Sequence, residues 1–339
     1  MKILLIMDPG IPVPPKLYGG HERLVFMFAD AYRKLGHEVN LLAGPDSGID
    51  GETFSFGVND LNRSKTQKSK ELLTAWNFLI NHVKNYDVIH NFGRLLYLLP
   101  VLNSSAKKIM TYGRPVATKG IKLINKLPNQ NLYFTACSDY CVSTGNVAGK
   151  WETVYNAIDF SDYQVTKNVE KDAPLMFLGR LDKIKGLHTA INVAKKTGHR
   201  LLIGGNLPNT ADNYAYFKEE IEPHFNNTDI IYLGALNDEQ KNHYLGQCKA
   251  LLFPIEWDEP FGMVMVEAMA CGTPVIAFNR GSVTEIIING ENGYIVSNEH
   301  EMIEALSSIH TIDRAACRYL AKSKYDVDVI AKKYLSLIS

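Results

Sequence analysis

The stretch "EPFGMVMVEAMACGTP", residues 259–274, sets a turn with a single glycine ahead of an almost wholly apolar segment. It predicts a buried helix that begins near Gly262 or Met263, with its first N–H groups available to an anion or a sugar hydroxyl. A carboxylate inside such a helix, Glu267, is costly unless it is paired or bound to ligand hydroxyls. Glu259 reaches the same region from the loop. The structural alternative is a capping Glu259 and a paired Glu267.

Short apolar runs alternate with helical patterns on both sides of this stretch. Such runs are typical of strands buried on both faces, and strands separated by helices imply parallel β-α-β units. The runs of the first half are "KILLIM" (2–7), "EVNLLAG" (38–44), "DVIHN" (87–91), "KKIMTY" (107–112), "NLYFTACS" (131–138) and "WETVYNA" (151–157). Those of the second half are "LMFLGRL" (175–181), "RLLIGG" (200–205), "DIIYLG" (229–234), "ALLFPI" (250–255) and "TPVIAF" (273–278).

A polar segment separates the two sets of strands. "DFSDYQVTKNVEKDAP" (159–174) is poor in apolar residues and ends in proline, which is typical of a linker. The chain is therefore predicted to be an α/β protein with two doubly wound, Rossmann-like domains facing each other across a cleft. We place them at 1–163 and 164–324.

Composition excludes several classes of protein. Of the 339 residues 46% are apolar and 21% charged, and the formal net charge is zero, so no bulk field recruits nucleic acid. Local patches leave a weak peripheral membrane contact open, and no obligate protein partner is evident. The N-terminal apolar run is too short for a signal peptide or a membrane span, which predicts a cytoplasmic protein. The five cysteines lack C-x-x-C spacing and are expected to be reduced thiols.

The loop "GRLDKIKG" (179–186) follows the first strand of the second half. Ligands of open α/β sheets bind beyond the carboxyl ends of the strands, so this loop is a candidate site. Arg180 supplies a planar guanidinium and Lys185 a point-charge ammonium, a combination that suits a diphosphate. The alternative is a solvated basic loop.

Two further candidates lie in the first half. In "YGGHE" (18–22), Gly19 and Gly20 allow backbone N–H groups to approach an anion at a helix N-terminus, although an ordinary tight turn also fits. The chain has neither a G-x-G-x-x-G fingerprint nor a Walker lysine, so the dinucleotide and P-loop interpretations fail. The ends of two strands carry the remaining candidates, which are His90, Tyr112 and Arg114.

Together these motifs resemble the retaining GT-B glycosyltransferases of glycosyltransferase family 4. The E-x7-E signature of that family is present as Glu259 and Glu267, and "FLGRLDKIKG" resembles its "GR…KG" loop. "VYNAIDF" (154–160) is similar to its "NGID" segment, and Gly19-Gly20 to its glycine loop. The resemblance covers nearly the full length and is strongest across 175–296.

The resemblance implies that a nucleotide-diphosphate sugar binds to the second domain and an acceptor (glycan, lipid or small molecule) to the first. Arg180 and Lys185 would hold the diphosphate, Glu267 the ribose hydroxyls and Glu259 the transferred sugar. The segment 325–338 resembles the last helix of the family, which crosses back to the first domain and extends it by 325–339. Further donor contacts would come from the glycine loop, from the backbone at Phe261, Gly262, Met263 and Val264, and from Leu236 near the base.

The same resemblance implies a reaction without a metal ion or other cofactor. Cations and a helix N-terminus aimed at the leaving diphosphate stabilise its charge. The only D-x-D, "DVD" (326–328), falls in the expected last helix. Many members carry a histidine at about the place of Gly113. Here His90, the backbone or Arg114 is the expected substitute on the catalytic acceptor side, unless the acceptor is bound differently.

Two other interpretations stay open. One is a non-catalytic protein that binds nucleotide sugars, and the other is a different GT-B enzyme such as a phosphorylase or an epimerase. A nicotinamide-dependent dehydrogenase is disfavoured because neither half has the glycine fingerprint. The base, the sugar and the acceptor are not specified by the sequence.

Overall fold

The computed structural model describes residues 1–16 and 19–338 and divides the chain into two compact units. The first unit is Met1–Ala157 together with Val327–Ser339, and the second is Ile158–Asp326. The sequence placed these boundaries at 163/164 and 324/325, a few residues away from the observed ones.

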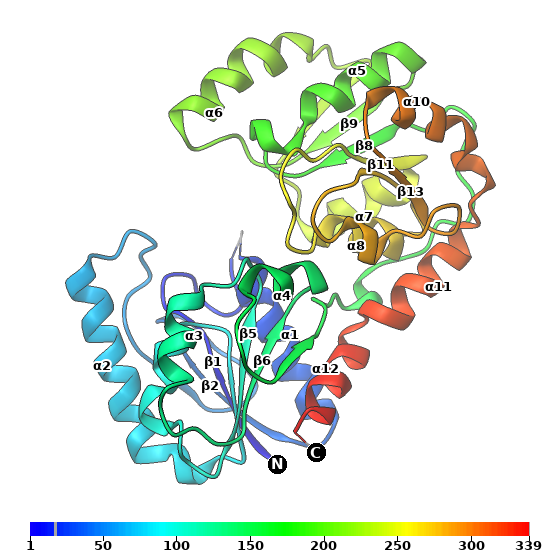
Figure 1. The fold of residues 1–339 in the computed structure, drawn as a ribbon. Coiled ribbons are helices and arrows are strands. Elements are labelled where there is room, and N and C mark those ends of the chain that lie inside the picture. The colour runs from blue at the N-terminus through cyan, green and yellow to red at the C-terminus, as the bar shows by residue number, and fades with distance from the viewer. Residues whose placement is uncertain (17–18, 339) are drawn as a thin grey trace. The chain divides into compact units, whose positions relative to one another are not determined.

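The first unit contains a seven-stranded parallel sheet (Figure 1). Its strand order, β3-β2-β1-β4-β5-β6-β7, is that of a doubly wound fold whose direction of winding reverses between β1 and β4. The strands are β1 (Lys2–Ile6), β2 (Glu38–Ala43), β3 (Thr53–Ser55), β4 (Val88–Asn91), β5 (Lys107–Tyr112), β6 (Leu132–Ala136) and β7 (Trp151–Thr153). The continuous apolar runs explain this arrangement, because helices cover both faces of the sheet.

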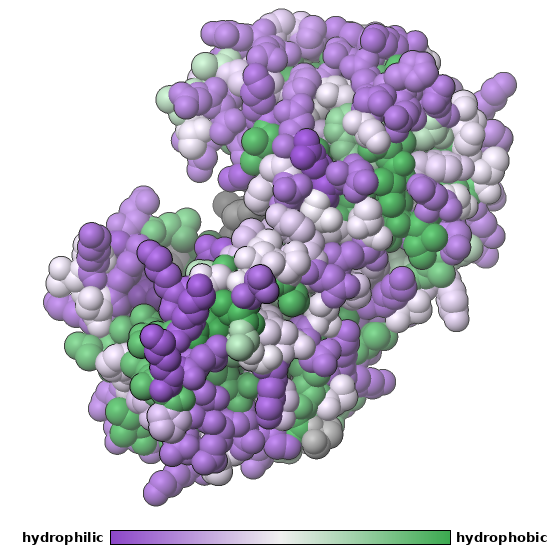
Figure 2. Space-filling view, viewed as in Figure 1, coloured by the Kyte–Doolittle hydropathy of each residue, from purple (hydrophilic) through white to green (hydrophobic). Residues whose placement is uncertain are grey.

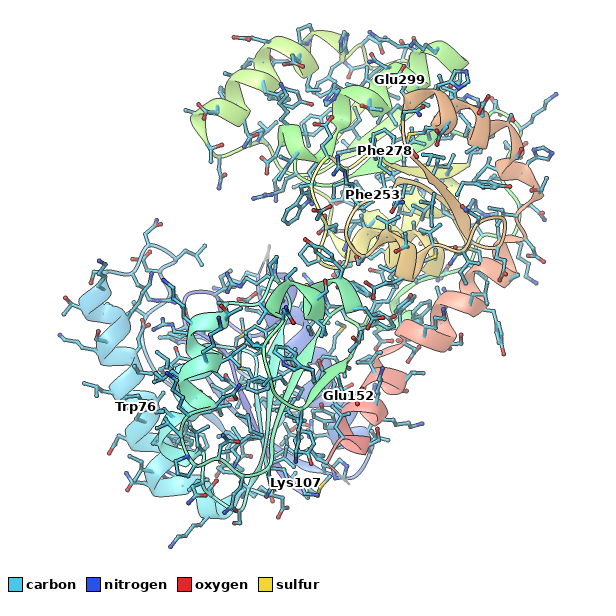
Figure 3. The ribbon with its side chains drawn as sticks, in the orientation of Figure 1. Trp76, Lys107, Glu152, Phe253, Phe278 and Glu299 are labelled. Atoms are coloured by element: carbon cyan, nitrogen blue, oxygen red, sulfur yellow. The ribbon has the colours of Figure 1, made fainter. Side chains whose placement is uncertain are left out.

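The helices of the first unit form one layer on each face of the sheet. They are α1 (Gly20–Lys34), α2 (Lys65–His82), α3 (Thr118–Ile124), α4 (Asp139–Gly145) and α12 (Val327–Ser336). The apolar faces of α1 and α12 pack in one core cluster, and those of α2 and α3 in the other. At the end of the chain, Lys107 Nζ donates a hydrogen bond to the carbonyl of Ile338 (Figure 3 labels Lys107).

The second unit repeats the plan with six parallel strands in the order β10-β9-β8-β11-β12-β13. Its winding reverses between β8 and β11. The strands are β8 (Leu175–Leu178), β9 (Leu201–Gly204), β10 (Ile230–Gly234), β11 (Ala250–Phe253), β12 (Val275–Phe278) and β13 (Gly293–Val296). The α-helices are α5 (Leu187–Thr197), α6 (Ala211–Tyr216), α7 (Asp238–Gln247), α8 (Met263–Ala270), α9 (Val283–Ile286), α10 (Glu299–Ser308) and α11 (Arg314–Tyr325). Figure 2 shows hydrophilic residues over most of the visible surface around α5 and α6.

The C-terminal segment differs from the single helix expected over 325–338. Helix α11 ends at Tyr325, Asp326 has an extended backbone (φ −65°, ψ 138°), and α12 begins at Val327. Asp326 forms a parallel bridge with Ile158, and the backbone N–H of Ile158 also donates to the carbonyl of Tyr325. The first aspartate of "DVD" is therefore outside a helix: its N–H still donates to the carbonyl of Lys322, and its extended ψ ends α11 there.

Two expectations from composition can be compared with the structure. The five cysteines are buried and form no disulfide within the described residues. Over that same part of the chain, no helix is both long enough and apolar enough to cross a membrane.

Candidate active site

The stretch that carries Glu259 lies at the switch point of the second sheet. Phe253 ends β11 (Figure 3), and the loop that follows leads into α8. Gly262 is the N-cap of α8 in a left-handed conformation (φ 81°), and a Cβ there would lie 2.6 Å from the terminal carbon of Met265. The turn glycine is therefore required by its backbone conformation and by the close approach of Met265. The helix begins at Met263, as the sequence predicted.

Glu259 and Lys185 are brought together from two different loops. Lys185 ends a short 3-10 turn after β8, and its Nζ lies 2.7 Å from Glu259 Oε2. Trp257 Nε1 donates to the same oxygen at 3.1 Å, and Lys185 Nζ lies 4.9 Å from the centre of the Trp257 ring. A carboxylate, an ammonium and an indole thus form one cluster beyond the carboxyl ends of β8 and β11. Its members are partly buried, which strengthens the attraction between the charges.

The loop after β12 supports the Glu259 backbone. The N–H of Ser282 donates to the Glu259 carbonyl at 3.0 Å, and its Oγ donates to the Phe261 carbonyl at 2.9 Å. A Cβ at Gly281 would overlap the Glu259 backbone, so the two loops approach too closely for any side chain there. Sequence reasoning missed Gly281 and Ser282, and the available signal was a glycine three residues after the end of an apolar strand.

Arg180 has a different environment from Lys185. Its guanidinium forms an ion pair with Asp182, with 2.7 Å between Nη2 and Oδ2, and its side chain is 44% exposed. The Asp182 side chain is buried. Arg180 is thus held at one end by a fixed anion while it remains open to solvent, and this leaves its remaining donors accessible to a ligand.

Glu267 is buried (8% exposed), and the structure gives it protein partners. Its Oε1 accepts hydrogen bonds from Lys241 Nζ at 2.6 Å and from the Tyr163 hydroxyl at 3.3 Å, and Lys241 also lies 2.8 Å from Asp238 Oδ1. Burial, followed by the charge of Glu267, raises the pKa of Tyr163 well above its usual range. Burial alone would lower the pKa of Lys241, but the two carboxylates outweigh it and the pKa is raised. Glu267 is therefore paired within the protein, as the structural alternative described it.

Leu236 lies at the carboxyl edge of the second sheet. A Cβ at Gly204, the last residue of β9, would lie 2.6 Å from Leu236 Cδ1, so the glycine makes room for this side chain. The neighbouring Gly205 approaches the carbonyl of Gly179 so closely that no side chain fits. The loops after β8, β9 and β10 therefore meet at the edge where the sequence placed the base of the ligand.

His90 does not occupy the position that its predicted catalytic role requires. It is fully buried within the first unit, where Nδ1 lies 3.1 Å from the Tyr32 hydroxyl and Nε2 lies 2.8 Å from Thr111 Oγ1. Burial lowers the pKa of His90 to about 3. Because both ring nitrogens are satisfied inside the core, His90 has no atom left for a substrate. We therefore correct its assignment on the catalytic and acceptor sides to a structural one.

The glycines of the first unit lie where α1 begins. Gly19 is the N-cap of α1 and Gly20 its first residue, while Tyr18 lies outside the described residues. A Cβ on Gly19 would lie 2.7 Å from Pro15 Cβ, whereas a Cβ on Gly20 would meet nothing within 4 Å. Packing therefore requires a glycine only at position 19.

Tyr112 and Arg114 lie at the end of β5 on either side of Gly113. The Tyr112 hydroxyl is buried without a hydrogen-bond partner among the described residues, and burial raises its pKa. Arg114 is exposed. Burial, and then the charge of Arg114, lowers the pKa of His21 on α1, whereas burial raises the pKa of Glu22 against a smaller opposing effect of Arg114. His21 lies within "YGGHE", and no sequence pattern marked it as a candidate residue.

Comparison with known proteins agrees with this fold. A family model described as "Glycosyl transferases group 1" matches residues 160–333, just over half of the chain. The chain belongs to this family. The region that matches this glycosyl transferase model contains the Arg180, Lys185, Glu259 and Glu267 loops described above.

Individual relatives of the chain are distant. A 41.2 kDa protein in the cps region of Klebsiella pneumoniae is 29% identical over 58% of this chain and 57% of its own length. Spore coat protein SA of Bacillus subtilis is 22% identical over 87% of this chain and 85% of its own. The chain thus spans little more than half of the Klebsiella relative.

Solved structures show the same fold. Anabaena Alr3699/HepE in complex with UDP superposes with a TM-score of 0.75 at 18% identity, covering 99% of each chain. At that identity the likeness shows the fold, which is the GT-B arrangement of two Rossmann-like domains.

Proposed function

We propose that the protein is a retaining glycosyltransferase of family 4 that moves a sugar from a nucleotide-diphosphate sugar to an acceptor hydroxyl without a metal ion. The observation that carries the proposal is the Lys185–Glu259 pair, 2.7 Å apart, in front of the N-terminus of α8. It stands at the switch point of a doubly wound sheet, where ligands of this fold bind. HepE, which shares the fold, has been solved with UDP and with UDP-glucose.

In this proposal the cations act on the leaving group. The bond between the sugar and the diphosphate breaks with its electron pair, and negative charge develops on the diphosphate. Arg180, Lys185 and the first N–H groups of α8 supply positive charge in a fixed arrangement, so no metal ion is needed for this stabilisation. When the diphosphate binds Lys185, it takes the place of the Glu259 carboxylate. Glu259 then accepts hydrogen bonds from the hydroxyls of the sugar.

The remaining donor contacts follow from their places in the fold. Glu267 accepts its protein hydrogen bonds through Oε1, and Oε2 has no hydrogen bond among the described residues, so we assign Oε2 to the ribose hydroxyls. Phe261 to Val264 offer backbone groups to the sugar and phosphate, and Leu236 lines the base. In the first unit we keep Gly19 and Gly20 as anion-binding glycines, and Tyr112 and Arg114 as acceptor contacts.

Titration calorimetry with nucleoside diphosphates tests the donor site. Arg180→Ala and Lys185→Ala are each expected to weaken binding about ten- to a hundred-fold, because a charge-assisted hydrogen bond contributes roughly 1.5–3 kcal/mol. Arg200→Ala is the matched control, since Arg200 is an exposed arginine at the amino end of β9, away from the ligand edge. Equal affinity in all three variants would overturn the assigned site. A chain that binds nucleotide sugars but never converts them to the nucleoside diphosphate would favour the non-catalytic alternative.

A further inference from the structure

The second unit has a pocket of about 1170 Å³ at the edge of its sheet opposite to the candidate active site. Lys249 directly precedes β11, Pro274 directly precedes β12 and His199 lies just before β9, so we call it the amino-edge pocket. Its other walls come from the linker 167–171, from α10 and from the start of α11. A four-residue strand spans about 13 Å at roughly 3.3 Å per residue, which separates this pocket from the loops after β8 and β11.

The charged side chains around the amino-edge pocket are mainly cationic. The cations are Lys167, Lys171, Lys249 and Arg314, and the carboxylates are Glu170 and Asp313. The pocket thus has an excess of two positive charges in a chain whose formal net charge is zero. Asp313 is already engaged, since its Oδ1 accepts from the N–H groups of Ala315 and Ala316 at the start of α11. The local charge therefore favours an anionic ligand.

Arg314 is a buried cation that is held by neutral groups. Its side chain donates to the carbonyls of Thr166, Cys248 and Gly246 and to Thr273 Oγ1, and the residue is 7% exposed. Burial lowers the pKa of Arg314, and the groups that oppose this effect are cysteines rather than carboxylates. A buried charge without a counterion is costly, so an anion bound beside Arg314 would be stabilised.

Lys249 is the second cation held by a neutral partner. Its Nζ lies 2.9 Å from His199 Nε2, and His199 Nδ1 lies 3.0 Å from Thr197 Oγ1. An ammonium can only donate, so the imidazole accepts through Nε2. Burial and then the charge of Lys249 lower the pKa of His199, which favours this neutral ring. Lys249 forms no ion pair within the described part of the chain, and two of its three N–H donors remain for a ligand.

The rest of the amino-edge pocket is apolar. Its apolar lining consists of Val169, Pro274, Ile303, Leu306, Ile309 and Ile312. Sites for small organic molecules have this character, with mostly apolar walls and a few polar groups that fix the orientation. A bare inorganic anion would leave these walls in contact with water, whereas an organic anion would cover them.

We propose that the amino-edge pocket binds an organic phosphate, with the phosphate at Lys249 and Arg314 and an apolar body against α10. A phosphate monoester carries about 1.5 to 2 negative charges at pH 7, which matches the local excess of positive charge. The pocket lies within the second unit and shares no residue with the proposed donor site. The inference therefore goes beyond the proposed function and does not depend on it.

Titration calorimetry of the full chain with 1-naphthyl phosphate tests the ligand class. We expect a Kd below about 1 mM, and at least about tenfold weaker binding of 1-naphthol, which lacks the phosphate, and of inorganic phosphate, which lacks the apolar body. The absence of saturable binding up to about 10 mM would overturn the proposal. Equal binding of 1-naphthol or of inorganic phosphate would overturn the ligand class.

Variants of two lysines locate the binding site. Lys249→Gln is expected to weaken binding of 1-naphthyl phosphate about tenfold or more, because it removes a charge-assisted donor. Lys195→Gln is the matched control, since Lys195 Nζ lies 2.8 Å from His224 Nδ1 in the same unit but does not line the pocket. Equal affinity in these two variants would overturn the site. The double variant Arg180→Ala/Lys185→Ala is expected to keep the wild-type affinity, and a loss there would place the probe in the donor site instead.

Two alanines at the start of α11 give a test that does not depend on removing a cation. Both Ala315 and Ala316 are exposed in the first turn, where an added carboxylate stabilises a helix, but only Ala315 lines the pocket. Ala315→Glu is expected to weaken binding of 1-naphthyl phosphate about tenfold without lowering the melting temperature, because its charge repels the phosphate. Ala316→Glu is expected to keep the affinity within about threefold. An equal loss of affinity in both variants, or no loss in either, would overturn the proposed position of the phosphate.

Discussion

At the scale of single residues, the two glutamates of the opening stretch differ in how they are held. Glu259 accepts from Lys185 and Trp257 at a partly exposed edge, while Glu267 is buried with Lys241 and Tyr163. An unpaired buried charge could be removed without loss of stability. A paired buried charge cannot be removed without loss of stability, since the charge of its partner stays buried with less electrostatic compensation.

Glu267→Gln is therefore expected to lower both stability and donor affinity. The amide keeps the bond to Tyr163 but loses the charge opposite Lys241, which retains Asp238, so we expect a loss of about 1–3 kcal/mol in unfolding free energy. Nucleotide affinity is expected to fall about tenfold. Glu259→Gln is expected to lower turnover more than affinity. Urea unfolding and calorimetry on both variants provide the measurements, and a Glu267→Gln chain with unchanged stability would contradict the pairing argument.

His90 makes stability depend on pH. Its pKa is about 3 in the folded chain and near 6.5 when unfolded, so in this range the unfolded chain binds a proton that the folded chain does not. The free energy of unfolding is thus expected to fall as the pH drops from about 6.5 towards 3, by at most about 1.4 kcal/mol per pH unit from this group. In His90→Gln the unfolded chain binds one proton fewer, so the dependence of the unfolding free energy on pH should be less steep. Urea midpoints between pH 4.5 and 7.5 measure it, and parallel curves for both proteins would refute the assignment.

At the scale of elements, the left-handed glycine before α8 determines where the helix begins. Gly262→Ala is expected to lower stability by about 1–2 kcal/mol, from backbone strain, and to weaken nucleotide binding because the first N–H groups of α8 move. Gly290→Ala is a matched control, since Gly290 has a similar φ of 80° with nothing within 4 Å of the added carbon. Both variants carry the strain of the left-handed backbone, and Gly262→Ala adds the contact with Met265, so we expect the larger loss of stability, and weaker binding, in Gly262→Ala. Equal nucleotide affinity in calorimetry would contradict a role for the α8 terminus.

At the scale of the whole molecule, the end of the chain completes the core of the first unit. Tyr334 on α12 is buried, its ring centre lies 5.3 Å from that of Phe28 and 4.5 Å from that of His90, and its hydroxyl lies 3.4 Å from Thr111 Oγ1. Residues more than 220 positions apart thus share one core.

Tyr334→Ala is expected to destabilise the first unit by about 3–5 kcal/mol, as for other large aromatic truncations in a core. Calorimetric scans should show one transition move down while the transition that nucleotide raises stays in place, because the donor site belongs to the second unit. Tyr319→Ala serves as the control, since Tyr319 is 73% exposed on α11. A uniform shift of both transitions would show that the units do not unfold independently.

The proposed chemistry also makes a prediction about metals. Sugar transfer is expected to survive excess chelator, because Arg180, Lys185 and the α8 terminus supply the positive charge that a divalent ion would otherwise provide. Turnover after treatment with chelator, with and without added magnesium or manganese, measures this. Activity that is lost to chelator and regained with either ion would refute the metal-free proposal.

The sequence by itself determined the features that depend on local pattern. Continuous apolar runs predicted the parallel strands, and the order of runs and helices predicted two doubly wound units. Gly262 and the apolar segment after it predicted the start of α8. The Arg180 and Glu259 loops could be located because each directly follows a strand, and the carboxyl ends of parallel strands share one edge. These inferences need only neighbouring residues and the period of the hydrophobic pattern along the chain.

Only the tertiary structure decided which distant side chains meet. Lys241 and Tyr163 approach Glu267 from 26 and 104 positions away, and no local pattern marks either as its partner. The His21 ring occupies the space that a side chain at position 113, 92 positions away, would need. The His90 ring points into the core, towards Tyr32 and Thr111. The physical reason is that charge compensation and steric exclusion act through space. Backbone propensity and hydrophobic periodicity, in contrast, act along the chain.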